Sequence, residues 1–419
     1  MRQFILPLGL AALSLSVSPS FAAVEPAASP YTPGPVLEAP GPLTLERAME
    51  LAAAGNFTLS AAQKEVDANE GSVMQAGVIP NPEIAATIED TRKESRTTTG
   101  QLNIPLELGG KRSARITAAE KGRELAQAQL SVTRAEVRSN VIRAFFAVLV
   151  AQERIKLASG SVEIAKKGAV AAARRVAAGK ISPVEETKAK VEQANAELEL
   201  DNANAELRSA RAALAALWGN SVPQFSEAQG DLETLPARPG LSELLIELEH
   251  SPLVQADQIE LDRRQALVGV ERSRQYPDVT VSVGAKRDNS ANRNMAVLGV
   301  SIPLPLFDRN QGNLYEALRR ADKAQDELLA NRLRLMTEMQ QASTELAVSR
   351  QSAQTLKSTI LPASEQAYNA AVRGFDAGKF NFLDVLDAQR TLFQARIRYL
   401  DVLAKLYQST TTIDRLLGR

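Results

Sequence analysis

The chain has 419 residues, and its 49 Lys and Arg balance 49 Asp and Glu, so its formal net charge is zero. This balance leaves no net field to attract nucleic acid or anionic lipid, and the absence of cysteine excludes disulfides, thiolate metal sites and cysteine catalysis. Aromatic residues make up only 4%, and no stretch beyond the N-terminus reaches 18 consecutive apolar positions, which argues against a helical membrane protein.

Residues 1–22 have the pattern of a secretory signal peptide. Arg2 supplies the positive charge, Phe4 to Val17 the apolar core, and Ser20-Phe21-Ala22 a small-x-small cleavage site. The apolar run is shorter than the roughly 20 residues that a membrane anchor needs. We therefore expect an exported mature chain that begins near Ala23.

Residues 23–42 form a proline-rich, extended N-terminal segment. Two interpretations stay open for it, a disordered leader and an arm that lies along a folded surface. Six of its residues are prolines: Pro26, Pro30, Pro33, Pro35, Pro40 and Pro42.

The rest of the chain reads as two copies of one unit. Three pairs of motifs recur at offsets of 197 to 199 residues: Ile79-Pro80-Asn81 with Tyr276-Pro277-Asp278, Ile104-Pro105-Leu106 with Ile302-Pro303-Leu304, and Ala178-Gly179-Lys180 with Ala377-Gly378-Lys379. We expect a first repeat at 43–218, a linker at 219–240 and a second repeat at 241–416. Composition marks the linker, which is rich in Gly, Pro, Ser and acidic residues.

Each repeat is predicted to run from a broken helix through two strands to a long helix and a return helix. The broken helix covers Leu43–Ala53 and about Thr58 to Ala76 in the first repeat, and Leu241–Glu249 and the residues up to about Arg274 in the second. The strands are expected at about 83–90 and 99–107, then 278–286 and 295–305. The long helices are expected at 111–176 and 311–376, and the return helices at 182–218 and 381–416.

The long helix of the first repeat is the chain's most informative stretch. Lys111 to Val176 contains 66 residues without proline, which as a helix is roughly 100 Å long at about 1.5 Å per residue. A rod of that length suits a protein that crosses a gap. We expect a weak break at Ser159-Gly160-Ser161 and, in the second repeat, a kink at Pro362 because proline lacks the backbone donor.

Both long helices end in a turn with strong capping signals. Gly179 suits the left-handed position that ends a helix, and Ser182-Pro183 followed by Glu185 predicts a capping box with proline at the first helical position. In the second repeat Gly378 plays the part of Gly179, with Asn381 as N-cap and Asp384 three residues later. Each repeat should therefore form a long antiparallel hairpin with a tight tip.

The predicted strands alternate apolar and polar residues, as sheets with two different faces do. Their lengths suit tilted strands across a bilayer, although a soluble sheet packed on the helices has the same pattern. Four strands cannot close a membrane barrel, which needs about 8, and an open edge is forbidden in lipid. If these strands span a membrane, several chains must supply them together.

The run from Phe382 to Arg390 (Phe-Leu-Asp-Val-Leu-Asp-Ala-Gln-Arg), the tip turns and the duplicated unit resemble the TolC-type outer membrane factors over residues 43–416. Within that family, Pro80-Asn81-Pro82-Glu83 and the segment Glu107 to Arg112 are similar to the cobalt–zinc–cadmium (CzcC-like) branch. The resemblance implies a mainly α fold with a small β part. As a homotrimer it would form a 12-stranded outer-membrane β-barrel continued by a periplasmic α-helical barrel.

The same resemblance implies a function. The chain is expected to be the outer-membrane exit duct of a tripartite system in a Gram-negative bacterium, exporting heavy-metal cations with an inner-membrane RND pump and a periplasmic adaptor. Its other partners are expected to be outer-membrane lipid but not nucleic acid. The alternatives are a duct for multidrug efflux or type I secretion, and a periplasmic helical adaptor or scaffold.

Two sets of site residues follow. Asp384 and Asp387 match the family's acidic pore constriction, and they lie three apart on one helix face. The other interpretation is that both acids stabilise the positive N-terminal end of a helix. The proposed adaptor-docking tips are two three-residue turns, for which a plain helix connection is the other interpretation. They are Gly179, Lys180 and Ile181, and Gly378, Lys379 and Phe380.

Catalysis is not expected. The one histidine, His250, cannot form a catalytic triad or a metal site by itself. Gly109-Gly110-Lys111-Arg112-Ser113 does not have the glycine and serine spacing of a phosphate-binding loop. No cofactor or metal site is predicted, and Val141 to Val150 is expected to be packed core because ten apolar residues are too few to cross a membrane.

Overall fold

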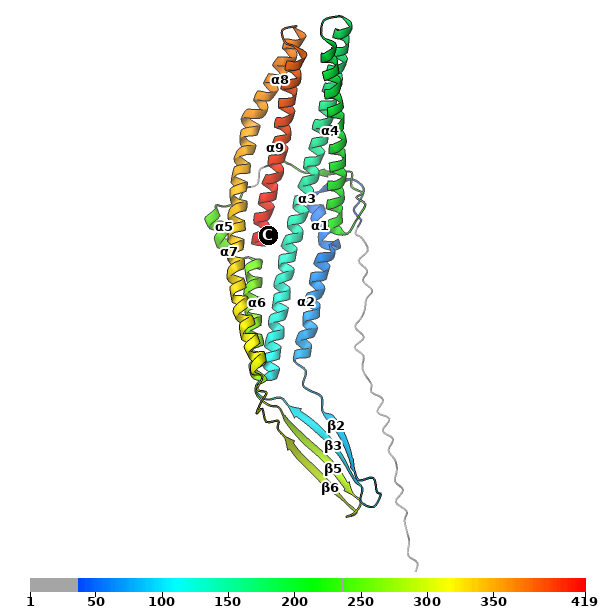
Figure 1. Ribbon diagram of the computed structural model, residues 1–419, viewed down its shortest axis with the longest axis vertical. Coiled ribbons are helices and arrows are strands. Elements are labelled where there is room, and N and C mark those ends of the chain that lie inside the picture. The colour runs from blue at the N-terminus through cyan, green and yellow to red at the C-terminus, as the bar shows by residue number, and fades with distance from the viewer. Residues whose placement is uncertain (1–36, 235–236) are drawn as a thin grey trace, which may run out of the picture. The chain divides into compact units, whose positions relative to one another are not determined.

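The structure is a computed structural model that describes residues 37–234 and 237–419 (Figure 1). The predicted signal peptide and most of the proline-rich segment lie outside the described residues. The prediction of a mainly helical chain with a small β part is confirmed. No helix among the described residues has the length and apolar character needed to cross a membrane.

The two repeats have the same element order. The first comprises α1 (Leu45–Gly55), α2 (Phe57–Ala76), β2 (Glu83–Glu89), β3 (Thr97–Leu106), α3 (Lys111–Ala177) and α4 (Pro183–Ala215), which ends in a 3₁₀ turn at Ala216–Trp218. The second comprises α5 (Leu241–Leu248), α6 (Pro252–Ser273), β5 (Val279–Asp288), β6 (Arg293–Ser301), α7 (Gln311–Thr355), a π-helical segment (Leu356–Ile360), α8 (Leu361–Asp376) and α9 (Phe382–Leu417).

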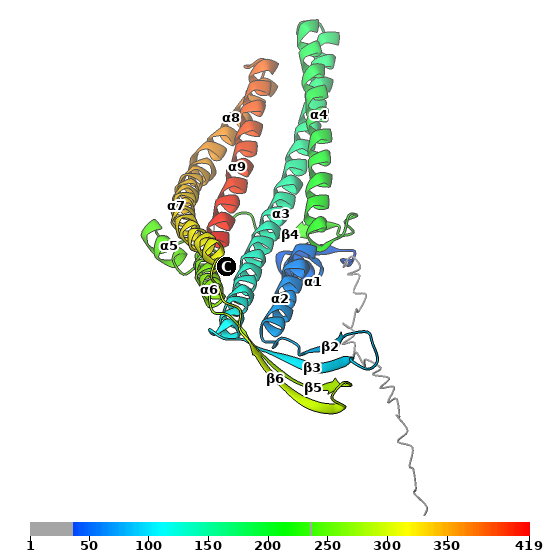
Figure 2. The same cartoon turned by 60° about the horizontal axis from the view of Figure 1, so that its bottom comes forward.

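Across the fold, both the helices and the strands run from those of the first repeat on one side to those of the second repeat on the other. α3 packs against α2 and α4 on one side and against α6 and α9 on the other, and α7 then packs against α6 and α9 (Figures 1 and 2). The four strands pair antiparallel in the order β2-β3-β5-β6. The fold therefore has two free edges, a first-repeat edge formed by α2, α4 and β2 and a second-repeat edge formed by α7, α8 and β6.

Two apolar cores hold the middle of the helical part together. One joins α1, α3 and the 3₁₀ turn around Phe145 and Trp218, and the other joins α5, α7 and α9 around Met339 and Leu406. Five side chains between Val141 and Val150 are buried, so the prediction of packed core for this stretch is confirmed.

The start of the described chain is fixed by a buried carboxylate. Glu38 is only 3% exposed, and it accepts hydrogen bonds from Trp218 Nε1 at 2.8 Å, Asn220 Nδ2 at 2.8 Å and the Gln224 amide at 2.6 Å. Burial alone raises the pKa of Glu38, but the three donors outweigh it, and the pKa lies below its ordinary value. This last part of the proline-rich segment is thus an arm on a folded surface.

Next to this carboxylate, two short strands connect the N-terminal arm to the linker between the repeats. β1 (Pro42–Thr44) pairs in parallel with β4 (Glu227–Gln229). Further along the linker, the Tyr407 hydroxyl of α9 donates to the carbonyls of Asp231 and Thr234 at 3.2 and 2.9 Å. Burial raises the pKa of Tyr407 to about 12, so this donor keeps its proton at physiological pH.

Three local predictions need correction. α3 continues through Ser159-Gly160-Ser161 without a break, because one interior glycine costs only about 1 kcal/mol and the flanking turns are packed. β6 ends at Ser301 rather than near 305, because its ladder with β5 ends at the pair of Ser301 with Thr280, next to the start of β5 at Val279. Ser182 Oγ accepts from the Val184 amide at 3.3 Å, but Glu185 completes no reciprocal capping box among the described residues.

The predicted proline kink corresponds to a π-helical segment. Leu356–Ile360 forms one wide turn immediately before Pro362, and the Leu361 amide bonds to the Leu356 carbonyl five residues back. Such a turn accommodates the missing donor and the ring of proline within a continuing helix. The second long helix is therefore divided into α7 and α8.

Candidate functional site

The tips of the two hairpins are built by the same backbone motif. In the first, Lys180 N donates to Arg175 O at 2.8 Å and Gly179 N to Val176 O at 2.9 Å. In the second, Lys379 N donates to Gly374 O at 2.8 Å and Gly378 N to Phe375 O at 3.0 Å. This is the Schellman pattern, and it needs the positive φ of 69° at Gly179 and 72° at Gly378.

The side chains at the two tips are arranged differently. Lys180 and Lys379 are both exposed. Ile181 packs against the small apolar core between the hairpins, whereas the Phe380 ring lies so close over Gly374 that an added Cβ there would clash with it. Each tip therefore exposes a lysine, but the apolar side chain that follows this lysine packs differently in the two tips.

The two hairpins of one chain are packed together below their tips. Their shared core is mostly small: Ala169, Ala172, Ala189, Ala371, Phe375 and Val385. The Arg175 guanidinium lies 3.7 Å from the centre of the Phe375 ring, and it donates to the Phe375 carbonyl at 3.3 Å. This cation–π contact adds an attraction between the two hairpins, whose small side chains bury little apolar area.

The structure brings Asp384 and Asp387 to the first two turns of α9, where both are exposed. The Asp384 carboxylate accepts from the Asn381 amide at 2.9 Å as part of a capping box. Neither carboxylate has an ion-pair partner in the described part of the chain. The next base, Arg390, is already paired with Glu192 of α4 at 3.0 Å. Asp384 therefore has a structural role as a cap, and Asp387 has none that the described contacts provide.

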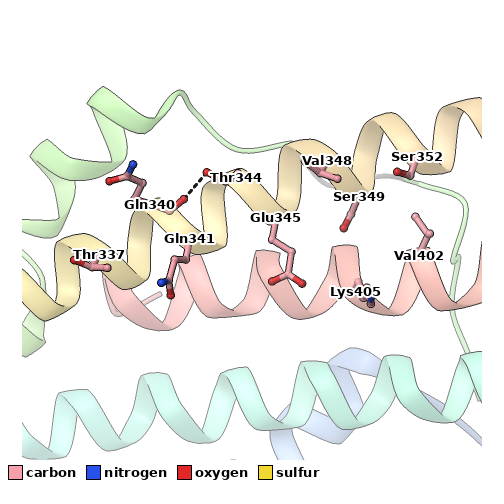
Figure 3. A pocket seen from close by; sticks show the side chains of 10 residues that line it. All are labelled: Thr337, Gln340, Gln341, Thr344, Glu345, Val348, Ser349, Ser352, Val402 and Lys405. Atoms are coloured by element: carbon pink, nitrogen blue, oxygen red, sulfur yellow. Dashed lines mark hydrogen bonds between the residues drawn. The ribbon is translucent and has the colours of Figure 1, made fainter.

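A groove of about 650 Å³, lined mainly by polar residue types, lies between α7 and α9 (Figure 3). Its stripe on α7 follows helical spacing: Thr337, Gln341, Thr344, Val348 and Ser352. Each of the first four lies two residues after a core residue of the same helix: Leu335, Met339, Ala342 and Leu346. Two residues turn a helix by about 200°, so the groove is on the side of α7 opposite to the α5 core.

The groove holds few charges. Glu345 and Lys405 are its charged residues, and the remaining polar ones carry hydroxyl or amide groups, as Figure 3 shows. Among the described residues no group of three or more His, Asp or Glu side chains could hold a metal ion. Sequence reasoning missed this groove, although Thr337, Gln341 and Thr344 recur at steps of four and three residues opposite an apolar stripe of the same helix.

One ion network joins three helices of both repeats. Arg154 of α3 pairs with Glu206 of α4 at 2.7 Å and also with Asp401 of α9. Arg154 is partly buried, so these pairs are less screened than fully exposed ones. Nothing in the sequence identified them, because the partners lie 52 and 247 residues away.

Comparison with known proteins places this geometry in context. The sequence pattern of the family described as "Outer membrane efflux protein" matches residues 48–220 and 246–419. The chain is 67% identical over 420 aligned residues, covering all of both chains, to the cobalt-zinc-cadmium resistance protein CzcC of Cupriavidus metallidurans. It is 35% identical to the nickel and cobalt resistance protein CnrC of the same species, over 74% of this chain and 73% of the relative.

A solved structure has the same fold. The outer membrane protein VceC from Vibrio cholerae superposes with a TM-score of 0.75 at 21% identity, covering 89% of this chain and 96% of that one.

Proposed function

The chain belongs to the outer membrane efflux protein family, and from this premise we propose that it is the outer-membrane exit duct of a tripartite efflux system for heavy-metal cations. The observation that carries the choice of cargo is the 67% identity, along the entire length, to a cobalt-zinc-cadmium resistance protein. Energy would come from an inner-membrane RND pump, linked to the duct by a periplasmic adaptor. No catalytic role is proposed for the chain itself.

We propose that three copies close into one ring. The first-repeat and second-repeat edges are different surfaces at opposite ends of one layer, and head-to-tail contacts between such edges generate rings. An unpaired strand edge is not tolerated in lipid, so β2 of one copy would pair with β6 of the next. Three four-stranded sheets would give the twelve-stranded barrel, and the helical layers would continue it as a tube.

The two faces of the sheet support a membrane position. Ile84, Leu102, Val283 and Leu298 share one row on one face, and the outer two are 84% and 80% exposed. The opposite face carries the row Glu83, Asn103, Ser282 and Gly299, in which Ser282 Oγ donates to Asn103 Oδ1 at 2.7 Å. An apolar outer face and a polar inner face are typical of outer-membrane barrels.

The helices support the same ring. Val184, Val191 and Leu198 are exposed on α4 at seven-residue spacing, the spacing with which one helix packs along another. α4 lies at the first-repeat edge, so a neighbouring copy would cover this stripe. The groove between α7 and α9, on the side opposite to the α5 core, would then line the inner wall of the tube with mainly polar residue types.

The tips supply the two remaining parts of the proposal. Asp384 and Asp387 would form the constriction, where three copies contribute six carboxylates that attract cations. The turns Gly179-Lys180-Ile181 and Gly378-Lys379-Phe380 would dock the adaptor. Localisation in the outer membrane of a Gram-negative bacterium, with a periplasmic extension, follows from this arrangement.

Deleting the gene from its host is expected to lower the inhibitory concentrations of cobalt, zinc and cadmium several-fold, while those of organic drugs stay unchanged. The reason is that pumped cations need a route through the outer membrane. The measurement is growth inhibition with and without a plasmid-borne copy of the gene. Sensitivity to drugs alone would indicate a multidrug duct instead.

Photo-crosslinkers placed at Lys180 and Lys379 are expected to capture the adaptor in assembled pumps, because both side chains are exposed at the tips. Lys64 on α2 is equally exposed but lies toward the strand end of the helices, so it serves as the matched control position. Capture from position 64 but not from the tips would contradict tip docking.

A further inference from the structure

An exposed apolar loop projects from the second-repeat edge where β6 leads into α7. Its residues Ile302, Leu304, Leu306 and Phe307 are all exposed, and Phe307 is 91% exposed. A single exposed apolar side chain is ordinary, but a contiguous group of large ones marks a surface that something covers. We therefore expect another surface to cover the apolar side chains of this loop.

The loop is held in shape rather than loose. The Leu306 amide donates to the Leu304 carbonyl at 2.9 Å, and Arg309 Nε donates to the Pro305 carbonyl at 3.3 Å. At its end Asn310 Nδ2 donates to both the backbone and the side chain of Glu271 at 2.8 Å. Phe307 is thus presented by a loop whose conformation is set before any partner arrives, which lowers the entropic cost of contact.

A hollow of about 650 Å³ lies on the first-repeat edge, where α2 leads into β2. Its apolar wall is formed by Ala76, Val78, Ile79 and Pro80, and its polar residues are Ser72, Gln75, Asn81, Glu107 and Arg115. Val78 and Ile79 are exposed. Like the loop, the hollow lies at the junction between helices and strands, so the two features occupy the same level on opposite edges.

Ion pairs and hydrogen bonds fix the floor of the hollow. Arg115 pairs with Glu107 and donates to the Val78 carbonyl at 3.3 Å. Nearby, Lys111 Nζ lies 2.7 Å from Asp278 Oδ1, and the Tyr276 ring covers Gly109, whose φ is 69°. An aromatic ring entering the hollow would find an apolar wall on one side and a guanidinium on another, a combination that binds aromatic side chains well.

We propose that Phe307 of one copy seats in this hollow of the next copy and latches the ring at the junction of strands and helices. The inference rests on the proposed function, because it needs the two edges to meet. Within one chain they cannot meet, since α3 and α6 separate α2 from α7. A second copy is favoured over lipid because the Phe307 ring can lie against the Arg115 guanidinium in the hollow, an attraction that a saturated lipid chain does not offer.

The absence of native cysteine allows a direct test on the full-length chain. The double variant Phe307→Cys with Ile79→Cys, and separately Phe307→Cys with Ala76→Cys, is oxidised in detergent and run on non-reducing gels. We expect covalent dimers and trimers that disappear on reduction, because each copy offers one cysteine to each neighbour. The matched control is Phe307→Cys with Val222→Cys, whose second site is exposed but lies in the linker, and it should stay monomeric on the gel.

Other outcomes separate the latch from the ring. A trimer by native mass spectrometry without disulfide-linked species in either test pair overturns the latch and leaves the proposed function intact. A monomer under all conditions overturns both. Strong quenching of Phe307→Trp by brominated phospholipid, above the background of the buried Trp218, means that position 307 faces lipid and also overturns the latch.

Discussion

Replacing Glu38 with alanine is expected to destabilise the folded chain by about 3–5 kcal/mol, since each buried donor left without an acceptor costs about 1–3 kcal/mol. The three donors concerned belong to Trp218, Asn220 and Gln224. They would lose one shared partner at a position that water reaches poorly. The measurement is chemical denaturation of the detergent-solubilised protein, followed through the single tryptophan that bonds to Glu38.

The matched control is Glu50→Ala. Glu50 is also close to the start of the fold, but its only ion pair among the described residues, with Arg47, is exposed, and exposed pairs contribute little. We expect no measurable change for it. If both variants lowered the free energy of unfolding equally, the special role assigned to the buried carboxylate would be contradicted.

The same carboxylate predicts a pH dependence. Because the pKa of Glu38 is lower in the folded chain than its ordinary value of 4.5, its ionised form contributes stability that is complete above that value. This contribution is lost as the pH falls through the folded pKa. The variant Glu38→Gln should be less stable at neutral pH and should lack that part of the acid dependence. Parallel acid-unfolding curves for this variant and the unsubstituted chain would be inconsistent with this account.

Removing the two tip carboxylates together, as Asp384→Ala with Asp387→Ala, is expected to raise single-channel conductance or to lower selectivity for cations. In the proposed trimer these two positions place six negative charges at the narrowest point, where the repulsion between like charges and the attraction of counter-ions are strongest. Planar bilayer recordings in asymmetric salt measure both quantities. Unchanged currents would contradict the constriction.

A second pair of substitutions separates charge from helix capping. Asp384 accepts a hydrogen bond from the Asn381 amide, so alanine removes a cap as well as a charge. Asp384→Asn with Asp387→Asn keeps a side-chain acceptor and removes only the charge. If the constriction depends on charge, the asparagine pair should reproduce most of the change in selectivity. An effect confined to the alanine pair would indicate that the tip has merely frayed.

Local signals in the sequence located features that depend on a few neighbouring residues. Gly179 and Gly378 marked the tip turns because few other residues adopt the left-handed backbone that ends both helices. The absence of proline from Lys111 to Val176 marked the long helix. In the structure α3 ends one residue beyond the predicted range. The proposal that the two tip carboxylates form a pore constriction came only from the family resemblance, because no local rule links such residues to a pore.

Other features could not be predicted because their partners are remote in the chain. Glu38 bonds to residues 180 to 186 positions away, and Arg154 bridges to Asp401 across 247 positions. The pairing of β1 with β4 involves three residues in each strand, too few for alternation to show. The groove between α7 and α9 needs two helices that are separated in the chain by α8.

The amino-acid sequence alone determined the duplication, the hairpins and their tips, because capping, chain stiffness and alternation act within a few residues of one another. Only the tertiary structure decided that the helical layer and the sheet share the same two free edges, and that a rigid exposed loop lies on one edge and a hollow on the other. The shared edges arise from packing between helices and strands of both repeats, and the loop and the hollow are fixed by hydrogen bonds that span 39 and 37 residues. In both cases contacts beyond the reach of a short stretch override its local preference.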